Sequence, residues 1–287
     1  MAKLLESKSV VDSHLEILKK RVAALSQVGI VPNMRVILVG ENPASLVYVK
    51  NKKALSEKVG AQCTIDKLPE NVSATDFISH LNSVVNNSSI HGCFVQLPLP
   101  KQLKDIPIAH MIPPAMDVDG FTPQSLFALM EGDKGDQALL PCTPKGIITL
   151  LQHYKIEIAG KDIVIIGRSL IVGKPMSYLF TNHDATVTLC HSKTKKIKEH
   201  TQKADIIVVA IGDAEYLDET FLNKNKNQVI IDVGMNKKSD GKLCGDVNFQ
   251  KVLDHCEAIT PVPGGVGPMT VLSLIENLIL AAERKGK

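Results

Sequence analysis

The sequence predicts an α/β protein made of two three-layer domains, each built on a mainly parallel sheet. In the first half, short apolar runs alternate with segments of helical periodicity, the order of a β-α-β-α-β unit. In the second half, Lys161–Met176 reads as a β-rich apolar run, a glycine loop and the start of a helix. The chain of 287 residues is long enough for two separate cores.

The first half contains three predicted strands and two predicted helices. The strands are Met34–Gly40, Gln62–Lys67 and Gly92–Gln96. The helices are Ser45–Val59 and Ala74–Asn86. Because each helix connects two strands, the connections favour parallel pairing with helices on both faces of the sheet.

A second unit is predicted from about Pro141 onward. Helices are expected from Lys145 and from Pro175, and strands at 163–166, 185–190, 205–211 and 228–233. The Asp240–Gly241 pair predicts a hairpin over 239–242. The last helix, Met269–Arg284, is too apolar to stand alone, so we expect it to pack on one domain or both. The predicted domains are 1–141, completed by 269–287, and 142–268.

The glycine loop has the geometry that holds a pyrophosphate, because free N–H groups and the helix dipole both point at the anion. The usual G-x-G-x-x-G pattern is absent, and Gly167 and Gly173 instead bound a longer turn that carries Arg168. Taken alone, the loop is compatible with a nucleotide site or with a simple chain turn.

The residues after the next predicted strand indicate which dinucleotide would bind. They are His191, Ser192, Lys193 and Thr194. NAD-binding folds place a carboxylate here for the ribose 2′-hydroxyl. A hydroxyl and basic groups, with Arg168 nearby, instead suit a 2′-phosphate, so this corner predicts NADP. The alternative is an ordinary basic loop facing water.

Tyr48 and Lys52 are four residues apart and therefore share a face of the first predicted helix of their domain. A tyrosine stacked on a ligand beside a desolvated lysine would form an acid/base pair. The alternative is a solvated surface, since most lysines are exposed. Short-chain dehydrogenases also use Y-x-x-x-K, but their pair lies downstream of the nucleotide loop, whereas this one lies far upstream.

Three further segments fall where an open α/β sheet places ligands, or where backbone can approach one closely. Gln96 closes the third strand, Asp117–Phe121 (DVDGF) follows on the next connection, and Pro263–Pro268 (PGGVGP) precedes the last helix. The alternatives are turn formers for the Gln and Asp residues and an interdomain hinge for the glycine segment.

Bulk properties exclude several classes of function. A net charge of +3 with scattered basic residues does not suggest a nucleic-acid partner. The cysteines are Cys63, Cys93, Cys142, Cys190, Cys244 and Cys256. Their wide spacing favours reduced thiols, and the dispersed histidines favour no metal site. With no signal-like segment and no uninterrupted apolar run of membrane-spanning length, we expect a cytoplasmic protein with no membrane partner.

From Leu4 to the last helix the chain resembles the bifunctional methylenetetrahydrofolate dehydrogenase/methenyltetrahydrofolate cyclohydrolase (FolD) family. The resemblance rests on five motifs in the family's order. They are YVxxK at Tyr48–Lys52, VQLPLP at Val95–Pro100, DVDGF at Asp117–Phe121, GRSxxVGxP at Gly167–Pro175 and PGGVGPMT at Pro263–Thr270. Each motif alone is weak, whereas the ordered set is specific.

The resemblance implies a folate site in a cleft between the domains. Lys52 would be the catalytic lysine, and Gln96 would hold it and tune its proton affinity. Tyr48 would stack on the folate with Ser45 near the same groups, and Asp119 would bind the pterin edge, where paired N–H donors suit a carboxylate. The remaining lining residues would be Pro263, Gly264 and Gly265.

The resemblance also implies an NADP site in a Rossmann-type second domain. The residues assigned to it are Gly167, Arg168, Ser169, Gly173, His191 and Ser192. Arg168 and Ser192 would contact the 2′-phosphate. The His191–Ser192 pair after the second strand argues against the family's NAD-using branch, which carries an arginine nearby. A homodimer through the nucleotide domains is implied as well. Met116 stands where many members have a lysine, a departure that could alter the rim of the cleft, and no role is assigned to it.

The implied chemistry has two steps. Hydride leaves the methylene bridge of 5,10-methylenetetrahydrofolate for NADP, and positioning dominates because no proton need be removed. Water then adds to the 5,10-methenyl cation, and Lys52 manages the protons as the ring opens to 10-formyltetrahydrofolate. Two alternatives stay open: a monofunctional dehydrogenase, and a catalytically silent NADP(H)-binding regulatory protein on the same fold.

Overall fold

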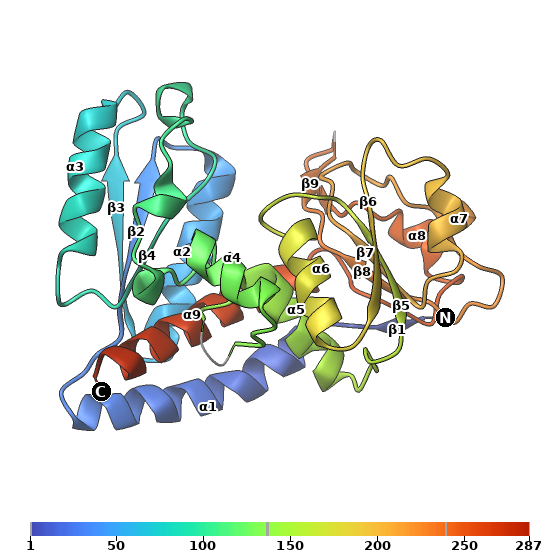
Figure 1. Ribbon diagram of the computed structural model, residues 1–287, viewed down its shortest axis with the longest axis horizontal. Helices are drawn as coiled ribbons and strands as arrows, with labels where there is room; N and C mark the ends of the chain where they lie inside the picture. The colour runs from blue at the N-terminus through green and yellow to red at the C-terminus, as the bar shows by residue number, and fades with distance from the viewer. Residues whose placement is uncertain (1, 136–137, 239, 287) are drawn as a thin grey trace. The chain divides into compact units, whose positions relative to one another are not determined.

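The computed structural model describes residues 2–135, 138–238 and 240–286, which form two compact α/β units (Figure 1). The three-stranded unit comprises 12–128, 135–142 and 271–287, and the six-stranded unit comprises 1–11, 129–134 and 143–270. The predicted α/β class with parallel sheets is confirmed.

The three-stranded unit has a fully parallel sheet of order β3-β2-β4. Its strands are β2 (Asn33–Val39), β3 (Gln62–Leu68) and β4 (Gly92–Val95), and its crossover helices are α2 (Pro43–Lys58) and α3 (Ala74–Val85). All five elements match the sequence prediction, with ends within two residues of those expected. The carboxyl ends of the strands meet at one edge of the sheet, where α/β folds bind ligands.

Side-chain alternation along the strands sends apolar groups to both faces of this sheet. Ile37 and Val95 point to the face covered by α3, where they join Phe77 and Leu81 in a buried cluster. Phe94 points to the opposite face and meets Lys52 of α2. The two faces thus separate a purely apolar core from a face that carries polar groups.

Two long helices, α1 (Lys8–Gln27) and α9 (Val266–Lys285), are joined by ion pairs within the three-stranded unit. The Arg21 guanidinium donates to both carboxylate oxygens of Glu283, at 2.8 and 2.7 Å. By length and a mean hydropathy of 1.3, α9 would pass as a membrane span. Because 61% of that segment is buried inside the protein, it is accounted for as a core helix.

Asn277 of α9 holds the backbone of two distant segments. Its Nδ2 donates to the carbonyls of Val118, at 3.0 Å, and Leu140, at 2.8 Å, and the residue is only 1% exposed. Asn277→Leu should lower the free energy of unfolding by roughly 2–4 kcal/mol, because two buried carbonyls lose an amide donor and the Val118 carbonyl keeps only the weak thiol donor of Cys142. Urea unfolding measures this loss. A change within 0.5 kcal/mol, the size of an ordinary surface substitution, would contradict the assigned role.

The six-stranded unit contains a parallel sheet of order β1-β11-β8-β7-β5-β6. Its strands are β1 (Lys3–Leu4), β5 (Asp162–Ile166), β6 (Thr186–Cys190), β7 (Ile206–Val209), β8 (Val229–Asp232) and β11 (Ala258–Ile259). β1 and β11 were not predicted, because two residues are too few to show an alternating pattern. Since Lys3 pairs with Ala258, the chain start belongs to this sheet and not to the predicted 1–141 domain.

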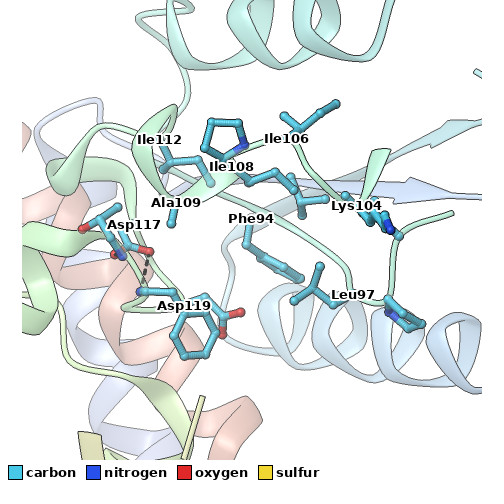
Figure 2. Close-up of a pocket in the computed structure, with 15 residues that line it drawn as sticks. Phe94, Leu97, Lys104, Ile106, Ile108, Ala109, Ile112, Asp117 and Asp119 are labelled. Atoms are coloured by element: carbon cyan, nitrogen blue, oxygen red, sulfur yellow. Dashed lines mark hydrogen bonds between the residues drawn. The ribbon is translucent and has the colours of Figure 1, made fainter. Parts of the chain in front are cut away.

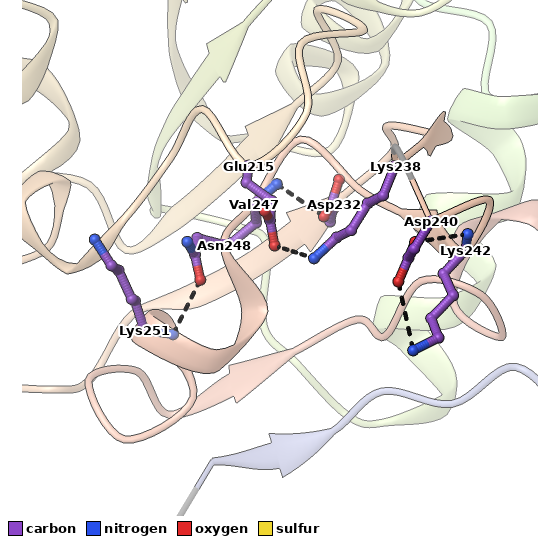
Figure 3. Close-up of polar contacts among 8 residues, drawn as sticks. All are labelled: Glu215, Asp232, Lys238, Asp240, Lys242, Val247, Asn248 and Lys251. Carbon is purple, nitrogen blue, oxygen red and sulfur yellow. Dashed lines mark hydrogen bonds and ion pairs between the residues drawn. The ribbon is translucent and has the colours of Figure 1, made fainter.

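The other helices among the described residues are α4 (Pro123–Met130), α5 (Cys142–His153), α6 (Gly173–Asn182), α7 (Ile197–Thr201) and α8 (Phe249–Val252). Short 3₁₀ segments lie at Lys101–Leu103, Ile108–His110, Pro114–Met116 and Glu219–Phe221. Helix α5 begins three residues before the predicted Lys145. The hairpin forms between β9 (Asn236–Lys237) and β10 (Leu243–Cys244), and Lys242 donates its backbone N–H to Asp240 at 3.0 Å (Figure 3). Ser239 lies outside the described residues.

Candidate active site

One face of α2 carries three of the predicted site residues of the three-stranded unit. Asn42 caps the helix by accepting the backbone N–H of Ser45 at 3.1 Å, which places Ser45, Tyr48 and Lys52 on successive turns. Ser45 is buried, and Tyr48 is half-buried. Burial raises the pKa of the Tyr48 phenol, so this side chain stays neutral at physiological pH.

Lys52 is a buried lysine held by two neighbours, one on β4 and one directly after that strand. It is 8% exposed, its Nζ lies 3.3 Å from Gln96 Oε1, and it lies 3.9 Å from the centroid of the Phe94 ring. Gln96 Nε2 donates to the Leu97 carbonyl at 2.8 Å, which leaves only its carbonyl oxygen for the lysine. The predicted lysine–glutamine contact is therefore present, with a fixed amide orientation.

Phe94 was missed from sequence. Phe94 and Gln96 are two residues apart, so strand alternation turns both side chains toward the same face. The ring attracts the ammonium through its electron-rich face, while the amide oxygen accepts a hydrogen bond. This period-two relation was visible in the motif GCFVQ and would have found the contact.

The two aspartates of DVDGF have different roles. Asp117 is buried and accepts the backbone N–H groups of Gly120, Phe121 and Thr122 at 3.0, 3.1 and 2.6 Å. It also accepts the Ser125 hydroxyl at 2.9 Å. Asp117 is thus the turn former, and its bonds fix the backbone that presents Asp119.

Asp119 is the aspartate available for a ligand. Burial raises the pKa of its carboxyl, and the Asp117 carboxylate adds to this effect, while the Lys52 ammonium and the Cys142 thiol act in the opposite direction. The charge of Lys52 is therefore felt at Asp119, so the two predicted catalytic groups lie in one electrostatic environment.

A cavity of about 560 Å³ in the three-stranded unit is lined by Phe94, Asp117 and Asp119, whereas Ser45, Tyr48, Lys52 and Gln96 do not line it. Its walls are mostly apolar, from Phe94, Leu97 and the connection Ile106–Ile112. Figure 2 shows Asp117 and Asp119 on one side of the cavity and Lys104 on the other. Asp117 is already bonded to its own turn, so Asp119 is the carboxylate that the apolar walls present to a ligand. Such a site suits a flat heterocycle that offers N–H donors. No sequence pattern had predicted that Lys104 or the connection Ile106–Ile112 would line a cavity.

Met116 does not line this cavity. It is 7% exposed and packs in the buried cluster with Ile37, Phe77 and Leu103. Met116 is therefore a core residue of this unit, because an unbranched apolar side chain at this position turns inward.

Two positions of the glycine loop in the six-stranded unit have no room for a side chain. Gly167 has φ +129°, and an ideal Cβ there would lie 2.2 Å from the Ala210 carbonyl oxygen. An ideal Cβ on Gly173 would lie 2.0 Å from the Gly167 carbonyl oxygen. Both positions therefore require glycine, as in a turn where backbone must pass close to backbone and to a ligand.

Helix α6 begins at Gly173 and not at the predicted Pro175, which still falls in the first turn. Ser169 explains the earlier start. Its Oγ accepts the N–H groups of Val172, at 3.1 Å, and Gly173, at 3.5 Å, and its carbonyl accepts that of Lys174 at 3.0 Å. The helix start thus offers fewer free N–H groups than expected, and Ser169 shapes the loop.

The residues assigned to the 2′-phosphate are available for it. Arg168 and Ser192 are exposed, and the turn after β6 is closed by His191, whose Nδ1 accepts the Lys193 N–H at 3.1 Å. No carboxylate stands in the four residues after β6. The tight glycine cradle and these donors fit NADP.

The Pro263–Gly265 segment belongs to the six-stranded unit, whereas Lys52, Gln96 and Asp119 belong to the three-stranded unit. Ser7 fixes it by donating its hydroxyl and N–H to the Gly264 carbonyl, at 2.6 and 2.9 Å. Gly264 has φ +104°, a conformation that favours glycine. The predicted folate residues thus fall on both units.

Fold and site together define a class: a two-unit α/β protein with a dinucleotide loop in one unit and a buried lysine, glutamine and aspartate in the other. Family models agree. Residues 5–119 match the catalytic domain of the tetrahydrofolate dehydrogenase/cyclohydrolase family, and residues 141–286 match its NAD(P)-binding domain. The chain belongs to this family.

Relatives cover the whole chain. It is 47% identical over 265 residues to the bifunctional protein FolD of Ligilactobacillus salivarius, covering 92% of this chain and 91% of the relative. It is 45% identical to the FolD of Halalkalibacterium halodurans, covering 98% and 99%. The Campylobacter jejuni FolD structure matches with a TM-score of 0.95 at 40% sequence identity. A Trypanosoma brucei FolD structure, complexed with NADP cofactor and inhibitor, matches with a TM-score of 0.91 at 30% sequence identity. The alignments cover 99% of both chains for the first and 99% and 98% for the second.

Proposed function

We propose that this chain oxidises 5,10-methylenetetrahydrofolate with NADP and hydrolyses the 5,10-methenyl product to 10-formyltetrahydrofolate. The observation that carries this proposal is the buried Lys52 held between Gln96 and Phe94, in one unit with Asp119. Full-length relatives named bifunctional FolD support it.

In the oxidation the protein acts by orientation. Asp119 accepts N–H groups of the pterin edge, Tyr48 stacks on the folate, and Ser45 lies near the same groups. Pro263, Gly264 and Gly265 present backbone to the folate. NADP, when bound, supplies the hydride acceptor. Arg168 and Ser192 hold its 2′-phosphate, and the Gly167–Gly173 turn, with Ser169 and His191 shaping the backbone, receives its pyrophosphate.

In the hydrolysis Lys52 moves protons. Water adds to the carbon between N5 and N10 and loses one proton, which gives a neutral hydroxyl adduct. N5 receives a proton as its bond to that carbon breaks, and the remaining hydroxyl proton leaves to solvent as the formyl C=O forms. Lys52 Nζ serves the first two transfers, and Gln96 Oε1 holds it in place. The apolar cavity wall limits competing water.

The retained Lys52–Gln96 pair disfavours a monofunctional dehydrogenase and a silent regulatory protein. We further infer a homodimer and a cytoplasmic location, with tetrahydrofolate derivatives as the partners and neither nucleic acid nor membrane among them.

A spectrophotometric assay tests the function. Purified protein is given 5,10-methylenetetrahydrofolate with NADP and, in parallel, with NAD. We expect NADPH to form without lasting methenyl absorbance, and NAD to be the poorer acceptor. Accumulation of the methenyl product would contradict the second activity, and no reduction of either cofactor would favour the regulatory alternative.

A further inference from the structure

Two aspartates of the six-stranded unit are fully buried and take no part in the proposed chemistry. Asp232 ends β8, and Asp246 follows the hairpin strand β10. Their exposures are 3% and 0%. Among the described residues, neither forms an ion pair with a lysine, arginine or histidine. Burying carboxylates without a cation is costly, so their hydrogen bonds must have a use.

Asp246 is bonded to the loop that follows β7. Its Oδ2 accepts the backbone N–H groups of Ile211, at 2.7 Å, and Gly212, at 3.0 Å. Its Oδ1 accepts the side-chain amide of Asn236 at 2.8 Å. All three partners are donors, so a carboxylate with two accepting oxygens matches this position.

Asp232 in turn holds Asp246. It accepts the N–H groups of Gly234 and Asp246 on Oδ1, at 3.0 and 2.9 Å, and that of Val247 on Oδ2, at 3.0 Å. Figure 3 shows the bond to Val247. Burial raises the pKa of Asp232 to about 7, and the backbone bonds oppose this rise.

Glycines make room for both carboxylates. An ideal Cβ on Gly234 would lie 2.2 Å from Asp246 Oδ1, and one on Gly245 would lie 1.7 Å from Asp232 Oδ2. Any other residue at either position would push a carboxylate out of place. The segment is therefore built around the two side chains.

The loop that Asp246 fixes is also the wall behind the glycine turn. Ala210, directly before Ile211, donates its N–H to the Ile166 carbonyl at 2.8 Å. The Ala210 carbonyl oxygen occupies the place where Gly167 would carry a Cβ. The Gly167 carbonyl oxygen in turn occupies the place where Gly173 would carry one. Contacts thus run from Asp246 through the loop after β7 to the start of α6.

We propose that Asp246 is a positioning residue of the dinucleotide site, which holds the loop after β7 so that the glycine turn keeps the shape NADP requires. This inference rests on the proposed function, because the turn is taken to bind NADP. Asp246 is fully buried, so it would influence the dinucleotide site only through the backbone of the loop after β7.

The test compares Asp246→Ala, Asp246→Asn and, as a matched control, Asp218→Ala. Asp218 also accepts a backbone N–H, that of Thr220 at 3.0 Å, but on the surface of the same unit. Calorimetric titration with NADP gives the Kd. Turnover of 5,10-methenyltetrahydrofolate, which needs no NADP, gives an independent readout in the intact protein.

We expect Asp246→Ala to raise the Kd for NADP about tenfold or more, because two backbone donors lose their acceptor. Asp246→Asn should recover part of the affinity, since its amide oxygen can still accept. KM for NADP should rise more than kcat falls, and methenyl hydrolysis and Asp218→Ala should stay near wild type.

Two results would overturn the inference: a Kd for Asp246→Ala within twofold of wild type, or equal losses of NADP binding and methenyl hydrolysis, which indicate a general folding role. Wild-type protein that binds no NADP would instead contradict the proposed function. The two failures are therefore distinguishable.

Discussion

Replacing Lys52 with methionine is expected to stop the hydrolysis of 5,10-methenyltetrahydrofolate while folate still binds. Methionine is unbranched like lysine and keeps an apolar contact with Phe94, so the buried site stays filled. It has no proton to give or accept. Removing a positioned acid/base group should reduce hydrolysis by roughly 10²–10⁴-fold.

The measurement follows methenyl absorbance with the folate substrate and NADP present. In Lys52→Met the methenyl product should accumulate, whereas wild type should consume it. Lys50→Met is the matched control, because Lys50 lies on the same helix but is exposed. Undiminished hydrolysis in Lys52→Met would refute the role assigned to Lys52.

The sequence predicted those parts of the site that depend on local periodicity. Tyr48 and Lys52 share a face because four residues make about one helical turn, and Gln96 lies at the sheet edge because it directly follows a strand. The resemblance added the pairing of Lys52 with Gln96, and the two side chains lie 3.3 Å apart.

Contacts that depend on long-range packing could not be predicted. Asn277 reaches the Val118 carbonyl across 159 positions, and Asp246 reaches Ile211 across 35. Nothing in a local pattern says which buried amide or carboxylate meets which loop. The two-residue strands β1 and β11 were not predicted for a related reason: they are defined only by their pairing with neighbouring strands of the sheet.

Met116 shows how a resemblance can mislead where plain chemistry would not. A lysine at this position in relatives suggested a rim, whereas the hydrophobicity of methionine alone predicts the core, where it lies. Ser169 carries a similar lesson. Its hydroxyl caps the turn before α6, so the helix starts ahead of the proline that seemed to mark its first residue.

Gly173→Ala should abolish tight NADP binding. Alanine favours helix over glycine by up to about 1 kcal/mol, so helix propensity alone would predict a more stable protein. No positive φ opposes the change either, but an ideal Cβ at this position meets only backbone atoms: the Gly167 oxygen at 2.0 Å and the Gly167 carbon at 2.5 Å. The turn must therefore open, and the Kd for NADP should rise by about 100-fold or more.

Gly160→Ala separates this steric effect from glycine strain in general. Gly160 has φ +73° in the same unit, but no atom lies within 4 Å of its ideal Cβ. That variant should lose about 1 kcal/mol of stability and bind NADP normally, because only backbone strain is added. Unchanged NADP affinity in Gly173→Ala would mean that the turn tolerates a side chain. The tight approach of Gly167 to Gly173 would then not be what shapes the cofactor site.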